Sequence, residues 1–352
     1  MIEKGVMRLE SVGEKSTVLV AGSEGYIGTV LVDALTTSGH KVLELDAFWY
    51  SKPNRGDQMV QDVRGFSISE LPILPDAVVY LAAVSNDPMG LHFEAATFSV
   101  NVDAAVELAR EAKSLGVARF VFASSCSIYG HAGEARKTEA DNLQPITAYA
   151  KSKVDAEKQL SALSDSNFQV TCLRFATACG SSPNLRLDLV LNDFVASAVQ
   201  TGKISILSDG TPWRPLINVS DIARAAEWAL THSYGYESLA INVGSEEFTY
   251  DIRGLAEGVA ALIPGTEVEI SSEPARDSRS YKVDFTLFRQ MAPDAQPLMG
   301  LQPTVFELVA QIKSINLGVD DFRKQPSYIR LIALEEMVLA GGHDDLLLPL
   351  LD

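Results

Sequence analysis

The stretch Val18-Leu-Val-Ala-Gly22-Ser-Glu-Gly25-Tyr-Ile-Gly28 decides the fold that we predict for this chain. Residues 17–21 are an apolar run typical of a buried strand, and residues 25–35 have the pattern of a helix. Glycines at such a junction let the backbone turn tightly and approach a pyrophosphate, whose charge is met by N–H groups at the helix start. Because the G-x-x-G-x-x-G spacing is one residue longer than the common G-x-G-x-x-G fingerprint, a tight turn with close helix packing is the alternative. We expect a dinucleotide to contact Gly22, Gly25, Tyr26, Ile27 and Gly28.

The second predicted strand ends in an acidic residue, in Glu44-Leu-Asp46. An acid about twenty residues after the glycines usually accepts hydrogen bonds from the adenosine ribose hydroxyls. The charge of Asp46 would repel a 2′-phosphate, which favours NAD over NADP. A solvated aspartate at a strand end is the alternative, and Lys52 and Arg55 in the following loop could soften the preference.

Short apolar runs alternate with helical patterns through the first half of the chain. This alternation predicts a parallel sheet covered by helices on both faces. The expected strands are 17–21, 41–45, 77–81, 119–123 and 169–174, and the expected helices are 25–35, 95–115 and 147–163.

The pattern changes after Gly180, where Ser181-Ser-Pro-Asn184 indicates a loop. Predicted helices at 189–199, 219–231 and 255–262, a strand at 203–207 and an apolar helical spacing in 327–352 follow. We therefore predict an α/β protein, a Rossmann-type doubly wound parallel sheet with a smaller mixed α/β C-terminal cap that binds substrate. The expected NAD-binding domain is 15–179 plus about 216–245, and the expected nucleotide-sugar domain is 180–215 plus about 246–352.

Composition excludes several classes of function. The 352 residues carry a formal net charge of -17 with no local basic patch, which disfavours binding to nucleic acid or an anionic membrane. Three cysteines without a C-x-x-C pair, and five scattered histidines, indicate neither a disulfide framework nor a metal site. No run of eighteen apolar residues and no signal-peptide pattern is found, so the expected location is the cytoplasm.

A tyrosine and a lysine four residues apart, Tyr149 and Lys153, lie on a predicted helix and therefore on one of its faces. An adjacent ammonium favours phenolate, which lowers the pKa of a tyrosine. A phenolate can take the proton of a sugar hydroxyl while hydride leaves for nicotinamide. Taken alone, the pair fits a surface tyrosine and lysine better than a catalytic pair.

Together with their context, these segments resemble the extended short-chain dehydrogenase/reductase superfamily, specifically its NAD-dependent nucleotide-sugar epimerases and dehydratases. The resemblance spans roughly residues 18 to 281. Its motifs follow in order as Gly22/Gly25/Gly28, Asp46, Asp62-Val63, Leu81-Ala82-Ala83, Asn101, Ser124-Ser125, Tyr149/Lys153 and Leu173-Arg174-Phe175.

The resemblance implies a role for each matching residue. Tyr149 would be the acid/base, Lys153 would bind the nicotinamide ribose, and Ser125 would hydrogen-bond the reacting oxygen, with Ser124 as the neighbouring candidate. Asp62 and Val63 would contact adenine, and Leu81, Ala82 and Ala83 would line the cofactor. Asn101 matches the family's helix-bending asparagine, and a simple cap is the alternative. The resemblance also implies a homodimer that packs helices 95–115 and 147–163 of two subunits together.

The residue two positions before Tyr129, in the segment that ends in Tyr129-Gly130, separates the possible reactions. Dehydratases and decarboxylases of the superfamily carry a glutamate two residues before that tyrosine, where this chain has Ser127 after Cys126. Neither side chain is a good base at neutral pH, which disfavours dehydration and favours epimerisation, expected at C4. The alternatives are a reductase of a nucleotide-linked 4-keto sugar that consumes NADH, a reductase of a small carbonyl compound, and a non-catalytic dinucleotide sensor.

A nucleoside diphosphate-sugar needs cations, and guanidinium suits bidentate contacts with phosphate. Arg214 matches the family's diphosphate-binding arginine, while Arg276 and Arg279 compete for a second position, with a lean to Arg279. Thr177 stands where sugar epimerases often place an asparagine. The expected substrate contacts are Ser85, Asn86, Ser127, Thr177, Asn192, Arg214, Arg276 and Arg279.

Overall fold

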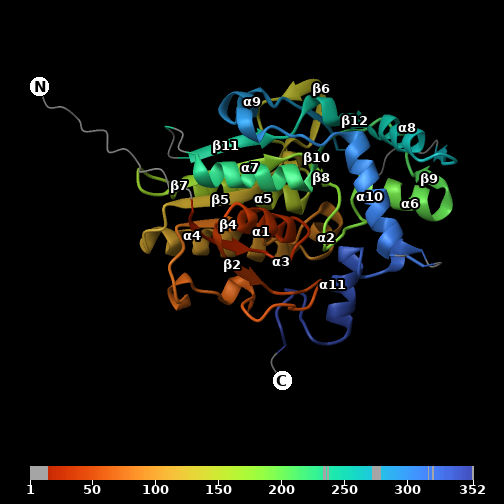
Figure 1. Cartoon of the computed structure of the whole chain (residues 1–352). Helices are drawn as coiled ribbons and strands as arrows, with labels where there is room; N and C mark the ends of the chain where they lie inside the picture. Colours follow the sequence, from red (N-terminus) through yellow and green to blue (C-terminus); the bar gives the residue numbers. More distant parts are fainter. Residues whose placement is uncertain are drawn as a thin grey trace, which may run out of the picture.

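The strands predicted in the first half of the chain meet in one central sheet (Figure 1). The structure is a computed structural model that describes residues 15–232, 235, 238–271, 279–315, 317–318 and 321–350. All pairs in the sheet are parallel, in the order β11-β7-β5-β4-β1-β2-β3. Its strands are β1 (Thr17–Ala21), β2 (Lys41–Asp46), β3 (Met59–Val60), β4 (Ala77–Tyr80), β5 (Arg119–Ser125), β7 (Gln169–Phe175) and β11 (Ser238–Val243).

Helices cover both faces of this sheet, which is why its strands are apolar on both sides. Val18 and Val20 face one hydrophobic core and Leu19 faces the other. The first core is closed by α1 (Gly28–Thr37), α7 (Val219–Thr231) and α9 (Thr286–Met291). The second is closed by α2 (Asp87–His92), α3 (Glu94–Phe98), the π-helical turn η3 (Ser99–Ala104), α4 (Ala105–Ser114), α5 (Ala148–Ser161) and α11 (Arg330–Leu339).

A smaller region with its own core follows β7. Its helices are α6 (Val190–Thr201), α8 (Ile252–Leu262) and α10 (Leu301–Ile315), which contact one another. In the part of the chain that the structure describes, the short strands form the sheets β12-β10-β8, β13-β9 and β14-β6. Their bounds are β6 (His131–Lys137), β8 (Thr177–Cys179), β9 (Lys203–Ile206), β10 (Trp213–Asn218), β12 (Thr249–Asp251), β13 (Glu267–Ile270) and β14 (Ser280–Val283).

The predicted fold class is confirmed: a doubly wound parallel sheet of Rossmann type with a smaller C-terminal region. The chain runs outward from β1 to β3 on one side and from β4 to β11 on the other, so the strand order reverses between β1 and β4. Ligands of open α/β sheets bind beyond the carboxyl ends of the strands at such a reversal. Short 3₁₀ helices lie in the connections of the described segments: η1 (Val63–Gly65), η2 (Ile68–Glu70), η4 (Cys126–Tyr129), η5 (Glu246–Phe248), η6 (Pro293–Ala295) and η7 (Phe322–Lys324).

Several element predictions need correction. The helix predicted from Gly25 begins at Gly28, because Gly22 to Ile27 form the turn. The long helix predicted at 95–115 contains the π-helical turn η3 in its interior. The sequence patterns did not predict α10 or β11. Among the described residues, no helix has the length and apolar character needed to cross a membrane.

Candidate active site

The glycine turn after β1 leaves no room for side chains. Gly22 has φ +88, and a Cβ there would lie 2.6 Å from the backbone nitrogen of Ala82. A Cβ at Gly28 would collide with the carbonyl oxygen of Gly22. The turn therefore packs against the loop after β4 while its backbone lines the cavity, an arrangement that fits close approach by a diphosphate.

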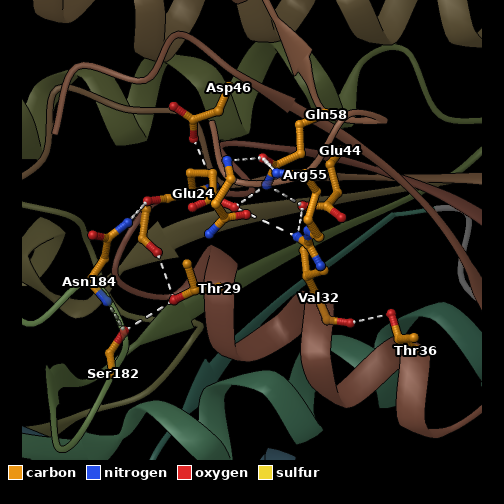
Figure 2. Close-up of polar contacts among 12 residues, drawn as sticks. Glu24, Thr29, Val32, Thr36, Glu44, Asp46, Arg55, Gln58, Ser182 and Asn184 are labelled. Carbon is orange, nitrogen blue, oxygen red and sulfur yellow. Dashed lines mark hydrogen bonds and ion pairs between the residues drawn. The ribbon is translucent and has the colours of Figure 1, made fainter. Parts of the chain in front are cut away.

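A group of carboxylates surrounds the end of β2 (Figure 2). Asp46 accepts hydrogen bonds from the backbone N–H groups of Glu24 (2.9 Å) and Phe48 (2.7 Å). Glu24 and Glu44 are both buried, and Gln58 and Arg55 bridge them. Burial, and then the charge of Glu44, raises the pKa of Glu24. Three acids thus lie where the adenosine ribose is expected, a setting that disfavours a 2′-phosphate.

A cavity of about 1240 Å³ opens beyond the carboxyl ends of the central strands. It runs from the glycine turn to the smaller region, and it is large enough for both a dinucleotide and a sugar nucleotide. Most of the residues predicted for the site line it: Gly22, Gly25, Tyr26, Ile27, Gly28, Asp46, Asp62, Val63, Leu81, Ala82, Ala83, Ser85, Asn86, Ser125, Ser127, Tyr149, Lys153, Thr177, Arg214 and Arg279.

Tyr149, Lys153 and Ser125 meet at the middle of this cavity. Tyr149 and Lys153 lie one turn apart on α5, and Ser125 ends β5. Burial raises the pKa of Tyr149 to about 12, while a hydrogen bond with Ser125 and the charge of Arg186 act in the opposite direction. Contrary to expectation, the pKa of Tyr149 lies above its ordinary value; the ammonium of Lys153 lies over the ring, 5.6 Å from its centroid.

Lys153 is only 2% exposed, and its ammonium also lies 4.6 Å from the centroid of the Phe122 ring. Burial lowers the pKa of Lys153 to about 7, whereas the nearby carboxylate of Glu157 raises it. A lysine held near neutrality can gain or lose a proton at physiological pH, which is a property of catalytic sites more often than of structural ones.

Glu157, one turn further along α5, is the centre of a buried hydrogen-bond network near Lys153. Its carboxylate accepts a bidentate pair of bonds from buried Arg174 (3.0 and 2.7 Å) and one from the Ser124 hydroxyl. Arg174 also donates to the Tyr129 hydroxyl at 3.1 Å. Ser124 is therefore committed to this buried network, and Ser125 is the serine that bonds to Tyr149.

Polar side chains from four segments form the wall next to Tyr149. Arg186 donates to the Ser85 hydroxyl at 2.9 Å and forms a bidentate pair with Asp188. Asp87 bonds to the Thr147 hydroxyl and forms an ion pair with Arg279. In each of these two pairs the arginine charge is matched by a carboxylate charge. This wall of the cavity therefore offers hydrogen-bond donors and acceptors with little net charge.

On the floor of the cavity, the buried hydroxyl of Ser127 has no hydrogen-bond partner within the described ranges. Thr177 bonds to Tyr281, whose ring lies 5.5 Å from the guanidinium carbon of Arg214. Arg214 is 7% exposed and donates to the carbonyl oxygen of Trp213 at 2.9 Å and to that of Arg279 at 2.5 Å. These residues are positioned to meet a hydroxylated ligand joined to an anion.

Two predicted residues lie outside the cavity lining. Asn101 sits inside η3, not at a helix start, and its amide binds the N–H (3.0 Å) and carbonyl (3.1 Å) of Val84. Asn101 therefore holds the loop after β4, and other residues of that loop line the cavity. Asn192 is fully buried and binds the backbone of Gly180 and Arg186 at 3.0 and 2.8 Å, so it holds the 180–186 loop. Arg276 lies outside the described residues.

Sequence reasoning missed several polar residues that line the cavity, among them Arg186, Asp188, Tyr281 and Arg330. Arg186 and Asp188 lie in the loop before α6, Tyr281 lies on β14 and Arg330 begins α11, so their burial depends on packing that local patterns do not show. The Arg-x-Asp spacing at 186–188 was the signal present for the first two. Within the described ranges, no group of three or more His, Cys, Asp or Glu side chains could hold a metal ion.

Comparisons with known proteins agree with this geometry. The model of the NAD dependent epimerase/dehydratase family matches residues 18–244. A UDP-glucose 4-epimerase of Lactobacillus helveticus is 27% identical over 268 residues, covering 66% of this chain and 81% of the relative. UDP-glucuronic acid decarboxylase 1 of Xenopus tropicalis is 22% identical over 324 residues, covering 89% of this chain and 73% of the relative. The crystal structure of Thermus thermophilus UDP-glucose 4-epimerase with NAD matches with a TM-score of 0.73 and 24% identity, over 84% of this chain and 99% of that one.

Proposed function

Because the chain belongs to the NAD-dependent epimerase/dehydratase family, we propose that it is an epimerase of a nucleoside diphosphate-sugar. Members of this family are enzymes that include epimerases, decarboxylases and dehydratases, and their cofactor is NAD. The observation that carries the proposal is the cluster of Tyr149, Ser125 and Lys153 in a cavity with no general base at position 127.

Tyr149 is the proposed acid/base. Its hydroxyl bonds to Ser125, so the two hydroxyl groups can hold one sugar oxygen between them. Tyr149 takes the proton of the C4 hydroxyl and later returns it, and Lys153 stabilises the phenolate that forms in between. Bound NAD supplies the acceptor for the C4 hydride and then the donor that returns it to the opposite face.

Position 127 argues against elimination of water. That reaction needs an acid/base beside the sugar ring, and the side chains at this place in the sequence are the Ser127 hydroxyl and the buried Cys126 thiol. Burial raises the pKa of that thiol well above its ordinary value, and its Sγ lies 3.1 Å from the carbonyl oxygen of Arg174 as a donor. Neither group can act as a base at neutral pH.

The proposed substrate lies with its diphosphate towards Arg214 and its sugar towards Tyr149. Arg214 offers the cationic head, Tyr281 offers a ring face, and the Ser85, Asn86 and Ser127 side chains offer partners for sugar hydroxyls. The paired charges of Arg186 with Asp188, and of Arg279 with Asp87, favour an uncharged sugar over a uronate.

The test is turnover of UDP-, GDP-, dTDP- and CDP-sugars by protein loaded with NAD, with products resolved by chromatography and NMR. We expect one sugar to equilibrate with its C4 epimer without net formation of NADH. Oxidation of one NADH per product would instead identify a reductase. Tight NAD binding without turnover of any sugar would contradict an enzymatic role and favour a sensor. The Tyr149→Phe variant is the matched control for contaminating activity.

A further inference from the structure

Arg330, the first residue of α11, carries a buried guanidinium into the cofactor end of the cavity. The residue is 2% exposed. Its Nη2 donates to the carbonyl oxygen of Asn184 at 3.2 Å, and its guanidinium lies 4.1 Å from the centroid of the Tyr50 ring. Its Nη1 is buried without a hydrogen-bond partner among the described residues.

This guanidinium has no salt-bridge partner within the described part of the chain. Burial, and then the charge of Arg186, lowers the pKa of Arg330 to about 10, while the charges of Asp188 and Asp46 act in the opposite direction. A buried cation with an unused donor is costly unless a ligand satisfies it. The ligand that removes both costs is an anion with oxygen acceptors, such as a phosphate group.

The position of Arg330 identifies which phosphate it meets. Asn184, which accepts its hydrogen bond, donates in turn to the carbonyl oxygen of Glu24 in the glycine turn (Figure 2). Asn184 therefore links Arg330 to the backbone of the glycine turn. A 2′-phosphate on the adenosine ribose would instead have to lie against Asp46 and Glu24, whose charges oppose it.

Other contacts fix α11 in this place. Leu334, in the middle of the helix, is fully buried in the core shared with α3 and α4. Beyond the helix, the carbonyl oxygen of Leu347 accepts a 3.0 Å bond from Arg64, which is itself paired with Asp62. Figure 1 shows α11 beside the segment that follows β2, although the two are nearly 300 residues apart.

We propose that Arg330 binds the diphosphate of NAD, which makes α11 a part of the cofactor site. This inference depends on the cofactor of the family and not on the reaction proposed above. It explains why the chain buries a cation that has no salt-bridge partner among the described residues in the wall of this cavity. A diphosphate seated between the glycine turn and Arg330 is held from two sides, which suits a cofactor that stays bound through a cycle.

The experiment measures binding by calorimetry to NAD-depleted protein, so that a failure of the epimerase proposal does not affect it. The ligands are NAD, ADP, adenosine and NADP, and the variants are Arg330→Met and Arg330→Lys. Glu336→Gln, an exposed residue on the same helix, is the control. Loss of a charge-assisted contact predicts that Arg330→Met weakens NAD and ADP binding about 10- to 100-fold. Adenosine binding should change less than about twofold, and Arg330→Lys should retain part of the affinity.

Three results would overturn the proposal. Unchanged affinity for NAD and ADP would mean that Arg330 does not meet the diphosphate. An equal loss for adenosine would mean that the residue acts by packing. Weaker binding of NADP alone would mean that it recognises a 2′-phosphate. Thermal melting of ligand-free protein checks folding: Arg330→Met should melt no lower than the parent chain, because it removes an unpaired buried charge. If Arg330→Met does not fold, the same binding series on Arg330→Lys decides.

Discussion

Replacing Lys153 with methionine should stabilise the ligand-free protein while abolishing its turnover. The ammonium of Lys153 is buried, and burial lowers its pKa from 10.5 to about 7. At about 1.4 kcal/mol per pKa unit, this fall means that the charged lysine costs the folded state about 5 kcal/mol. The contact of the ammonium with the Phe122 ring returns about 1 kcal/mol, so the expected gain for Lys153→Met near pH 6 is about 4 kcal/mol.

The gain must depend on pH with a defined sign. Below about pH 7 the lysine is protonated in both the folded and the unfolded chain, and the whole penalty is present. Between pH 7 and 10.5 the unfolded chain holds the extra proton, so the stability of the parent protein rises with pH. The difference between Lys153→Met and the parent should therefore shrink by about 3 kcal/mol from pH 6 to pH 9.

Urea unfolding of NAD-depleted protein at pH 6, 7.5 and 9 measures this difference. Lys151→Met is the matched control, because Lys151 lies two residues away on α5 and is exposed; its change should stay within about 0.5 kcal/mol. Destabilisation by Lys153→Met that is equal at every pH would refute the reasoning, since it would show that the lysine serves packing and carries no penalty for its charge.

Three further predictions concern the same cavity. Tyr149→Phe should lower turnover about 10²- to 10⁴-fold while NAD affinity, measured by calorimetry, stays within about threefold; near-normal turnover would exclude Tyr149 as the acid/base. Ser127→Ala removes a buried hydroxyl that has no partner among the described residues. The free energy of unfolding should therefore stay unchanged or rise by up to about 1 kcal/mol, whereas the KM for the sugar nucleotide should rise. An unaltered KM would argue against substrate contact. Gly22→Ala places a Cβ against the backbone of Ala82 at positive φ and should cost about 2–3 kcal/mol and abolish NAD binding, whereas Gly65→Ala, where a Cβ meets nothing within 4 Å, should do neither.

Local patterns predicted the central elements well. The strand Thr17–Ala21 and the helix Val219–Thr231 have the bounds that the sequence indicated. Both are stabilised by features that are visible locally. The strand is a short apolar run beside a glycine turn, and the helix has one apolar face and follows Asn218, whose side chain caps its first turn.

The elements that were missed depend on contacts between distant segments. β14 pairs with β6 from residue 280 back to residue 131, and β12 is only three residues long, so neither has a periodic signal of its own. The π-helical turn of η3 is another case. It places the amide of Asn101 on the loop after β4, a tertiary contact that no helical pattern reveals.

The candidate site likewise contains residues that the sequence could predict and residues that it could not. Residues that follow strands or share one helix face, such as Ser125, Tyr149 and Lys153, could be predicted because the fold brings such positions together. Arg186 and Arg330 could not, since an arginine in a polar loop or at a helix start looks solvated until packing buries it. The pKa of Tyr149 also differs from expectation, because burial outweighs the hydrogen bond with Ser125 and the charge of Arg186.

The fate of the hydrogen at C4 tests the proposed reaction most directly. A nucleotide sugar that is turned over should be offered with deuterium at C4, to protein loaded with unlabelled NAD, and both epimers analysed by NMR and mass spectrometry. If one active site removes and returns the same hydride, the inverted product keeps deuterium at C4 and no NADH accumulates. Loss of the label from the inverted carbon, or one NADH consumed for each product, would contradict the account.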